Sequence, residues 1–127
     1  MADLRTGVDL VEIERFQSAI RRYGTRFLNR VFTRQELEEV GENLASLAAR
    51  FACKEATAKA LGTGIGVVAW QEIEILRGPD REPVLCLHGA ASRLAGELEL
   101  ATWSISLSHT QSHAIAMVVA LKDNEKG

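Results

Sequence analysis

Apolar and polar residues follow one another in this chain with two periods, one typical of strands and the other typical of helices. Residues 4–11 form a short apolar run, which predicts a strand. From Ile13 the apolar positions recur at the spacing of one helix face, and Gly24 is a point where that helix can break. Residues 44–61 predict a longer helix, and Gly62 provides its C-terminal stop.

The remaining segments complete the pattern. Thr33 and Glu36 have the spacing of a capping box, which predicts a short helix that ends before Gly41. In residues 70–76 apolar and acidic residues alternate, which predicts a half-buried strand with Glu74 on its polar face. The same periods predict a strand in 84–89, a small helix in 90–98, and a hairpin of strands in 102–108 and 113–121.

The order of these elements indicates the fold class. Helices cluster early in the chain and strands late, which favours an α+β fold over a doubly wound parallel sheet. We therefore expect an antiparallel sheet packed against the long helix and the shorter helices. The 127 residues contain no linker, repeat or low-complexity tract, so residues 1–127 are expected to form a single domain.

Net charge, cysteine spacing and the lengths of apolar stretches limit which partners and which cellular compartment are expected. The net charge of −2 does not mark the molecule as a nucleic-acid binder. Cys53 and Cys86 have no metal-type spacing and are expected to be reduced thiols. We find neither a secretory signal nor an apolar stretch of membrane-spanning length, so a cytoplasmic protein without a membrane partner is expected.

Glu55 is the residue that fits the long helix least well. On a helical wheel it lies about 20° from Leu44, near the centre of an apolar stripe that includes Leu47, Ala48, Phe51 and Ala58. A buried carboxylate needs a cation or a proton, because removing its charge from water is unfavourable. Lys59 faces the same region one turn later. A simple ion pair between Glu55 and Lys59 at a helix edge is the alternative.

Asp9 supplies a second carboxylate near the end of the first strand. Together Asp9, Glu55 and Lys59 have the composition of a site for Mg²⁺ and a phosphate, because Mg²⁺ takes one or two carboxylates and completes its shell with water and phosphate oxygens. For Asp9 alone, an N-cap of the following helix is an equally ordinary role.

Two other stretches contain groups that suit a phosphate. "GTGIG" at 62–66 permits close backbone approach, as in a phosphate-cradling turn, although a helix cap explains two of its glycines. At the expected hairpin bend, His109 and Thr110 could donate to a phosphate, although a lone loop histidine is more often solvated. The serines before them share one strand face, which is either exposed or lines a polar cleft: Ser104, Ser106 and Ser108.

The first helix also has a basic ridge. Arg15, Arg22 and Arg26 fall within about 40° of one another on the wheel, beside the apolar stripe. The ridge could bind an acidic partner. The alternative is a solvated helix face, and nucleic acid is disfavoured because stacking aromatics and overall positive charge are lacking.

Four stretches together resemble one known family. They are "GVDLVEIERF" at 7–16, "FTRQEL" at 32–37, "RFACKEATAKALGTGIG" at 50–66 and "WSISLSHTQSHAIAMVVA" at 103–120. In this order they are similar to the holo-acyl-carrier-protein synthases, which are small trimeric 4′-phosphopantetheinyl transferases. The resemblance covers nearly the whole chain, and the third stretch is the most specific.

The resemblance implies a Mg²⁺-dependent transfer of 4′-phosphopantetheine from coenzyme A to a serine of an acidic apo-acyl carrier protein, with release of adenosine 3′,5′-bisphosphate. It implies Asp9 and Glu55 as metal ligands and, with Lys59, as catalytic residues. The implied coenzyme A-binding positions are Lys59, Gly62, Gly64, Ser108, His109 and Thr110. The implied carrier-docking positions are Arg15, Arg22 and Arg26. A homotrimer with sites at subunit interfaces is also implied.

Two other functions are compatible with the same residues. The first is metal-dependent hydrolysis of a nucleotide diphosphate; the arginine ridge argues against it, because water as an acceptor needs no docking surface. The second is a non-catalytic module that binds coenzyme A or a carrier protein. The presence of both carboxylates and of Lys59 argues against loss of activity.

Overall fold

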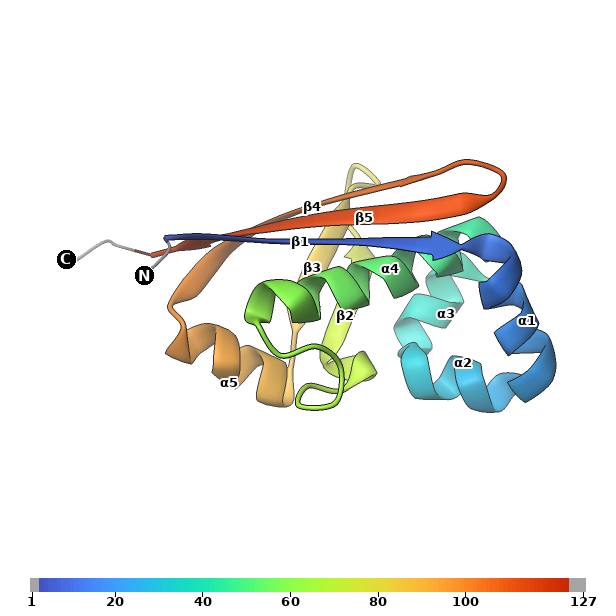
Figure 1. Ribbon diagram of the computed structural model, residues 1–127, viewed down its shortest axis with the longest axis horizontal. Coiled ribbons are helices and arrows are strands. Elements are labelled where there is room, and N and C mark those ends of the chain that lie inside the picture. The colour runs from blue at the N-terminus through green and yellow to red at the C-terminus, as the bar shows by residue number, and fades with distance from the viewer. Residues whose placement is uncertain (1–2, 124–127) are drawn as a thin grey trace.

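The computed structural model describes residues 3–123 and has two β-sheets with helices packed against them. The larger sheet is antiparallel, with strand order β1 (Leu4–Glu12), β5 (His113–Lys122), β4 (Leu100–His109). The long helix α4 (Leu44–Leu61) runs along one face of this sheet (Figure 1). The expected α+β class with an antiparallel sheet is confirmed.

The other elements lie around this central pair. Figure 1 shows the first three helices gathered at one end of the molecule and α5 toward the other. Their bounds are α1 (Ile13–Tyr23), α2 (Thr25–Val31), α3 (Arg34–Val40), the 3-10 turn η1 (Trp70–Glu72), β2 (Ile73–Arg77), β3 (Pro83–Leu87) and α5 (Gly89–Glu97). Strands β2 and β3 form a separate antiparallel hairpin.

Small residues allow α4 to lie close to the sheet. A Cβ atom added to Gly7 of β1 would overlap the carbonyl oxygen of Ala56 in α4. The neighbouring strand β5 turns a row of small buried residues toward the same helix: Ala114, Ala116, Val118 and Ala120. This close packing brings the middle of β1 beside the C-terminal half of α4, where the expected site residues lie.

The two predicted helix caps are confirmed. Thr33 and Glu36 form a complete capping box at the start of α3, which ends before Gly41. Gly62, in a left-handed conformation, caps α4 at the predicted residue. Gly24 breaks the first helix with a φ of 60°, so α1 and α2 are separate helices. The prediction that Arg26 shares one helix face with the earlier arginines is therefore wrong.

Burial differs from the prediction in two places: α4 is buried beyond its predicted stripe, and the prediction for Glu74 is wrong. Helix α4 is buried around most of its circumference, because packing on both sides covers Arg50 and Lys54 as well as the predicted stripe. Glu74, expected on an exposed face, is buried because its carboxylate binds the hydroxyl of Thr33 and the ring of His88. Within residues 3–123 we find no helix with the length and apolar character needed to cross a membrane.

Candidate active site

Asp9 and Lys59 meet where β1 lies against α4. The Lys59 Nζ donates hydrogen bonds to Asp9 Oδ1 and to the carbonyl oxygen of Val8, each at 3.0 Å. Asp9 is therefore not a helix cap; Glu12 holds the N-cap position of α1. Lys59 is also not paired with Glu55, so both of the simpler alternatives from the sequence are excluded.

Glu55 lies close enough to this pair to interact with its charges. Burial raises the pKa of the Glu55 carboxyl, the negative charge of Asp9 raises it further, and Lys59 opposes both effects. Glu55 is half-buried, and we find no hydrogen bond or ion pair from its carboxylate to any residue in the described range. The predicted convergence of the two carboxylates is supported by this shared electrostatic environment.

Asp9 and Glu55 line one cleft of about 540 Å³. Its lining also includes the aromatic side chains of Phe16 and Phe51 and the guanidinium-bearing Arg15. The cleft thus combines an acidic pair, a neighbouring ammonium group and an exposed arginine at the junction of β1, α1 and α4. Such a cleft can hold a charged group together with the less polar chain attached to it.

The donor set of this cleft fits a divalent cation such as Mg²⁺. Two carboxylates supply hard oxygen ligands, and the remaining ligands of Mg²⁺ are ordinarily water and substrate phosphate. Within the described part of the chain, no three His, Cys, Asp or Glu side chains form a cluster that could hold an ion without such help. Asp9 and Glu55 are the residues that would hold the ion.

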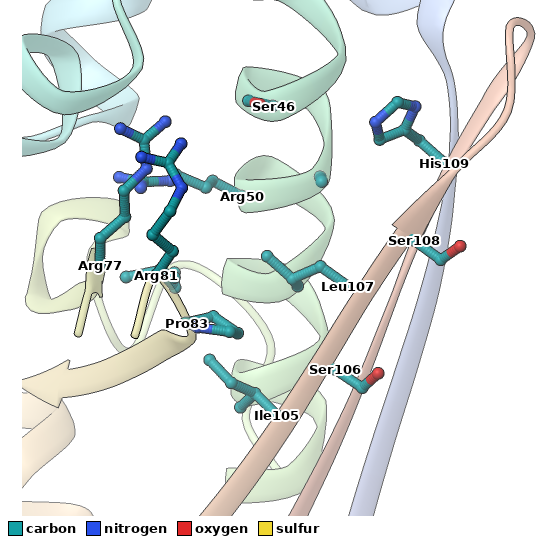
Figure 2. Close-up of a pocket in the computed structure, with 12 residues that line it drawn as sticks. Ser46, Arg50, Arg77, Arg81, Pro83, Ile105, Ser106, Leu107, Ser108 and His109 are labelled. Carbon is teal, nitrogen blue, oxygen red and sulfur yellow. The ribbon is translucent and has the colours of Figure 1, made fainter. Parts of the chain in front are cut away.

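A second pocket, of about 330 Å³, lies on another side of α4 (Figure 2). Figure 2 shows the guanidinium groups of Arg50, Arg77 and Arg81 at one end of the pocket, with His109 on the opposite side. None of the described lining residues is acidic. Apolar side chains cover the pocket between these groups: Pro83, Ile105 and Leu107.

Arg50 is the most unusual group in this basic pocket. The residue is only 5% exposed, and its Nη2 atom donates to Glu39 Oε1 at 3.1 Å. Its Nη1 atom is buried and has no hydrogen-bond partner among residues 3–123. A buried unsatisfied donor of this kind is unfavourable by roughly 1–3 kcal/mol. A bound anion would satisfy it.

The predicted coenzyme A-binding residues are not all in one place. Ser108 and His109 both line the basic pocket, although the Ser108 hydroxyl points away from the arginines in Figure 2. The Thr110 hydroxyl accepts hydrogen bonds from the backbone of Ser112 and His113, which stabilises the hairpin turn. The three serines of β4 are all exposed, and two of them, Ser106 and Ser108, line the basic pocket.

Gly62 and Gly64 follow α4 directly, and both have positive φ angles, of 85° and 71°. The backbone N–H groups of Gly62 and Gly64 bond to carbonyl oxygens of the last turn of α4. The glycines therefore end the helix, as the simpler alternative predicted. Their contact with coenzyme A stays a prediction.

The predicted docking arginines are all exposed. Arg15 lines the same cleft as Asp9 and Glu55, and its guanidinium lies 3.6 Å from the exposed Glu12. Such an exposed pair contributes little, so Arg15 remains available to another anion. Arg22 lies over the ring of Tyr23.

Two features were not predicted from the sequence: the basic pocket, and the buried ion pair between Lys54 and Glu36. Arg50 was overlooked because it occupies an interior helix position that apolar periodicity does not single out. Arg77 ends β2, and Arg81 lies in the turn between β2 and β3, where charged residues are common. The helical wheel places Lys54 on the flank of the apolar stripe opposite Lys59, and its side chain is fully buried beside Glu36. The pairing of charges in "FTRQELEE" with those in "RFACKE" was the available signal.

The chain matches known proteins over nearly its whole length. The family model of the 4′-phosphopantetheinyl transferase superfamily matches residues 5–118. This chain belongs to that superfamily. The holo-[acyl-carrier-protein] synthase of Herpetosiphon aurantiacus is 49% identical to it over 125 residues, which cover 93% of this chain and 98% of the relative.

Solved structures of the superfamily have the same fold. The Helicobacter pylori holo-[acyl-carrier-protein] synthase in complex with coenzyme A is 32% identical, with a TM-score of 0.83, and the match covers 91% of this chain and 98% of that chain. The Neisseria meningitidis synthase is 35% identical, with a TM-score of 0.85, and the match covers 93% and 98%. The transferase fold expected from the sequence is thereby confirmed.

Proposed function

We propose that this chain is a holo-[acyl-carrier-protein] synthase, one domain that transfers 4′-phosphopantetheine from coenzyme A to a serine hydroxyl of apo-acyl carrier protein. The observation that carries the proposal is that Asp9 and Glu55 line one cleft of a phosphopantetheinyl transferase fold, with Lys59 bonded to Asp9. Its two cysteines are free thiols, which are typical of a reducing compartment, and we therefore place the enzyme in the cytoplasm.

The two pockets suit the two charged parts of coenzyme A. Asp9 and Glu55, with Mg²⁺, would hold the diphosphate, and Lys59 would donate to it from an exposed ammonium group. Arg50, Arg77 and Arg81 offer donors to the phosphate on the ribose, and the apolar side chains beside them suit the base. The chemistry that Mg²⁺ supplies when bound is polarisation of the diphosphate and stabilisation of the departing charge.

The chain's own residues would align and neutralise the reactants. The serine oxygen attacks the phosphorus that carries pantetheine, and the bond from this phosphorus to the bridging oxygen breaks. Lys59 neutralises charge on the departing phosphate. The serine proton passes to Asp9 or Glu55, directly or through water. Both carboxylates line the cleft in which the serine would react.

A carrier-modification assay tests this function. The chain is incubated with coenzyme A and Mg²⁺, with and without apo-carrier protein, and a chelator is added in a parallel reaction. We expect mass spectrometry to find the arm on the carrier, with one equivalent of bisphosphate released, only when both carrier and metal are present. Bisphosphate release without carrier would identify a hydrolase, and binding of coenzyme A without turnover would identify a non-catalytic module.

We further propose that the enzyme is a homotrimer with shared sites. The sheet face opposite α4 exposes a continuous group of large apolar side chains from β1 and β5: Leu4, Val8, Leu10, Ile115, Met117 and Leu121. Exposed apolar surface of this kind is typical of an interface. In addition, the cleft lined by Asp9 and Glu55 (the acidic cleft) and the basic pocket share no described lining residue. This separation favours a coenzyme A site completed by a second subunit.

Subunit complementation tests the shared site. Glu55→Gln disables the acidic cleft, and His109→Ala disables the basic pocket. When the two inactive variants exchange subunits, a shared site predicts recovery of part of the activity, because some interfaces combine two intact pockets. Native mass spectrometry measures the oligomer. A monomer, or no recovery after proven exchange, would contradict the proposal.

Arg15 is proposed as a docking residue for the acidic carrier, together with Arg22 and Arg26. Its place in the cleft beside Asp9 and Glu55 would bring a docked carrier near the coenzyme. We expect Arg15→Glu to raise the KM for the carrier by about tenfold, since charge reversal replaces attraction with repulsion. The KM for coenzyme A should change little. Equal changes in both constants would argue against a docking role.

A further inference from the structure

Glu39 of α3 links two of the three arginines of the basic pocket. Its Oε1 atom accepts a hydrogen bond from Arg50 Nη2 at 3.1 Å and another from the backbone N–H of Arg77 at 3.0 Å. Glu39 does not line the pocket itself. A single carboxylate oxygen therefore joins α4 to the end of β2 from behind the pocket wall.

This contact leaves part of the Arg50 guanidinium for a ligand. Glu39 engages one terminal nitrogen, whereas Nη1 is buried with no partner in the described chain. A guanidinium held in this way has already lost its side-chain freedom, so an anion that reaches it meets a smaller entropic penalty. The acidic partner also keeps the charge of Arg50 compensated before the ligand arrives.

We propose that Glu39 is a positioning residue that sets the affinity for the ribose phosphate of coenzyme A by orienting Arg50 and the Arg77 backbone. This inference rests on the proposed function, because it takes coenzyme A as the ligand of the basic pocket. Glu39 acts through the two arginines and does not touch the substrate. Its role is to keep the free donor of Arg50 aimed at the phosphate.

The competing explanation is that Glu39 only fastens α3 to α4 and β2. Glu36 already makes this connection, since its carboxylate binds Lys54 Nζ and the backbone N–H of Ile75. A purely structural Glu39 would affect all substrates equally. A positioning Glu39 affects only substrates that carry the ribose phosphate, so the two explanations predict different kinetics.

The decisive variant is Glu39→Gln, assayed with coenzyme A and with 3′-dephospho-coenzyme A. We expect the KM for coenzyme A to rise about tenfold, with kcat within about twofold of wild type. The KM for the dephospho analogue should be the same in variant and wild type. Binding of adenosine 3′,5′-bisphosphate to the metal-free protein, measured by calorimetry, should weaken by a similar factor.

Glu38→Gln is the matched control, because Glu38 lies on the same helix and, among the described residues, pairs only with the exposed Arg34 at 3.2 Å. It should leave both KM values unchanged. If Glu39→Gln does not fold, Glu39→Asp keeps the charge but shortens the reach, and the same selective loss is expected.

An equal rise in KM for both substrates, or no rise for either, would overturn the positioning role. Failure of the wild-type chain to modify the carrier with coenzyme A would instead refute the proposed function. The wild-type reaction with coenzyme A therefore separates the two failures.

Discussion

Lys54 and Glu55 are consecutive in the sequence, yet the Lys54 charge is paired inside the core, whereas the Glu55 charge faces a cleft. The Lys54 ammonium is fully buried and donates to Glu36 Oε1 at 2.8 Å, to the carbonyl oxygen of Ile73 at 2.6 Å and to that of Trp70 at 3.2 Å. Burial lowers the pKa of Lys54, and the charge of Glu36 opposes this effect. All three N–H donors of the ammonium group are thus used inside the protein.

Glu55 faces the other way and is left without such partners. Its carboxylate lines a cleft beside Asp9, and its pKa is raised by burial and by this second negative charge. The comparison teaches that a charge satisfied within the fold holds elements together, whereas a charge left unsatisfied at a cleft is available to a ligand. The four predictions that follow test this distinction.

The largest effect is expected for Lys54→Met. Removing one partner of a buried ion pair leaves Glu36 charged without compensation, so the free energy of unfolding should fall by about 3–5 kcal/mol. Urea denaturation at fixed protein concentration measures the loss. Lys122→Met is the control: its partly exposed pair with Glu99, at 3.6 Å, should contribute less than about 1 kcal/mol. A similar decrease in the free energy of unfolding for both variants would contradict the special role of the buried pair.

Glu55→Gln should abolish function while the fold survives. We expect kcat/KM for carrier modification to fall by at least about 100-fold, because the amide removes one of two anionic ligands. Circular dichroism should remain that of wild type. Glu97→Gln, at an exposed position of α5, is the matched control and should be fully active. Normal carrier modification by Glu55→Gln would contradict the assignment of this cleft as the active site.

Gly7→Ala should weaken both stability and metal binding. The added methyl group would overlap the Ala56 carbonyl and push α4 away from β1, separating Asp9 from Glu55. We expect a stability loss of about 1–3 kcal/mol and weaker Mn²⁺ binding measured by electron paramagnetic resonance. Gly96→Ala is the control, since a Cβ there meets nothing within 4 Å. Unchanged Mn²⁺ affinity in a folded Gly7→Ala protein would contradict this geometry.

The smallest effect is expected in the melting temperature. In the presence of a chelator, the difference in melting temperature between wild type and Glu55→Gln should depend on pH. Above the ordinary glutamate pKa of 4.5 and up to the raised value, the folded wild-type protein binds more protons than the unfolded chain. Its free energy of unfolding therefore decreases as pH rises through that window. The variant should melt at a higher temperature than wild type at pH 7, with the difference vanishing as pH falls toward 4.5. A wild type that melts higher at pH 7 would show that Glu55 is stabilised by its surroundings.

Much of the fold could be predicted from local sequence. The bounds of α4, the capping box of Thr33 and Glu36, and the C-terminal hairpin all depend on residues close together in the chain. The errors arose where distant residues decide the outcome. Glu74 is buried because Thr33 and His88 satisfy its carboxylate, and neither partner is a sequence neighbour.

The candidate site was predicted in part for the same reason. Asp9, Glu55 and Lys59 each stand out locally, as a strand-end carboxylate or as charges on an apolar helix. Arg50 and Glu39 do not stand out, because their importance lies in a contact between α3 and α4 that leaves one buried nitrogen without a partner. A helical wheel assigns a residue to a face but does not say what covers that face.

Local sequence predicts the order and type of the elements, the family likeness, and which acidic and basic residues could carry the chemistry, because periodicity and capping act over a few residues. Three other outcomes depend on tertiary contacts. Lys59 binds Asp9 and not Glu55, the Lys54 ammonium forms a buried ion pair with Glu36, and three arginines line a second pocket. These outcomes depend on how closely α4 approaches its neighbours, which is set by packing across the whole core.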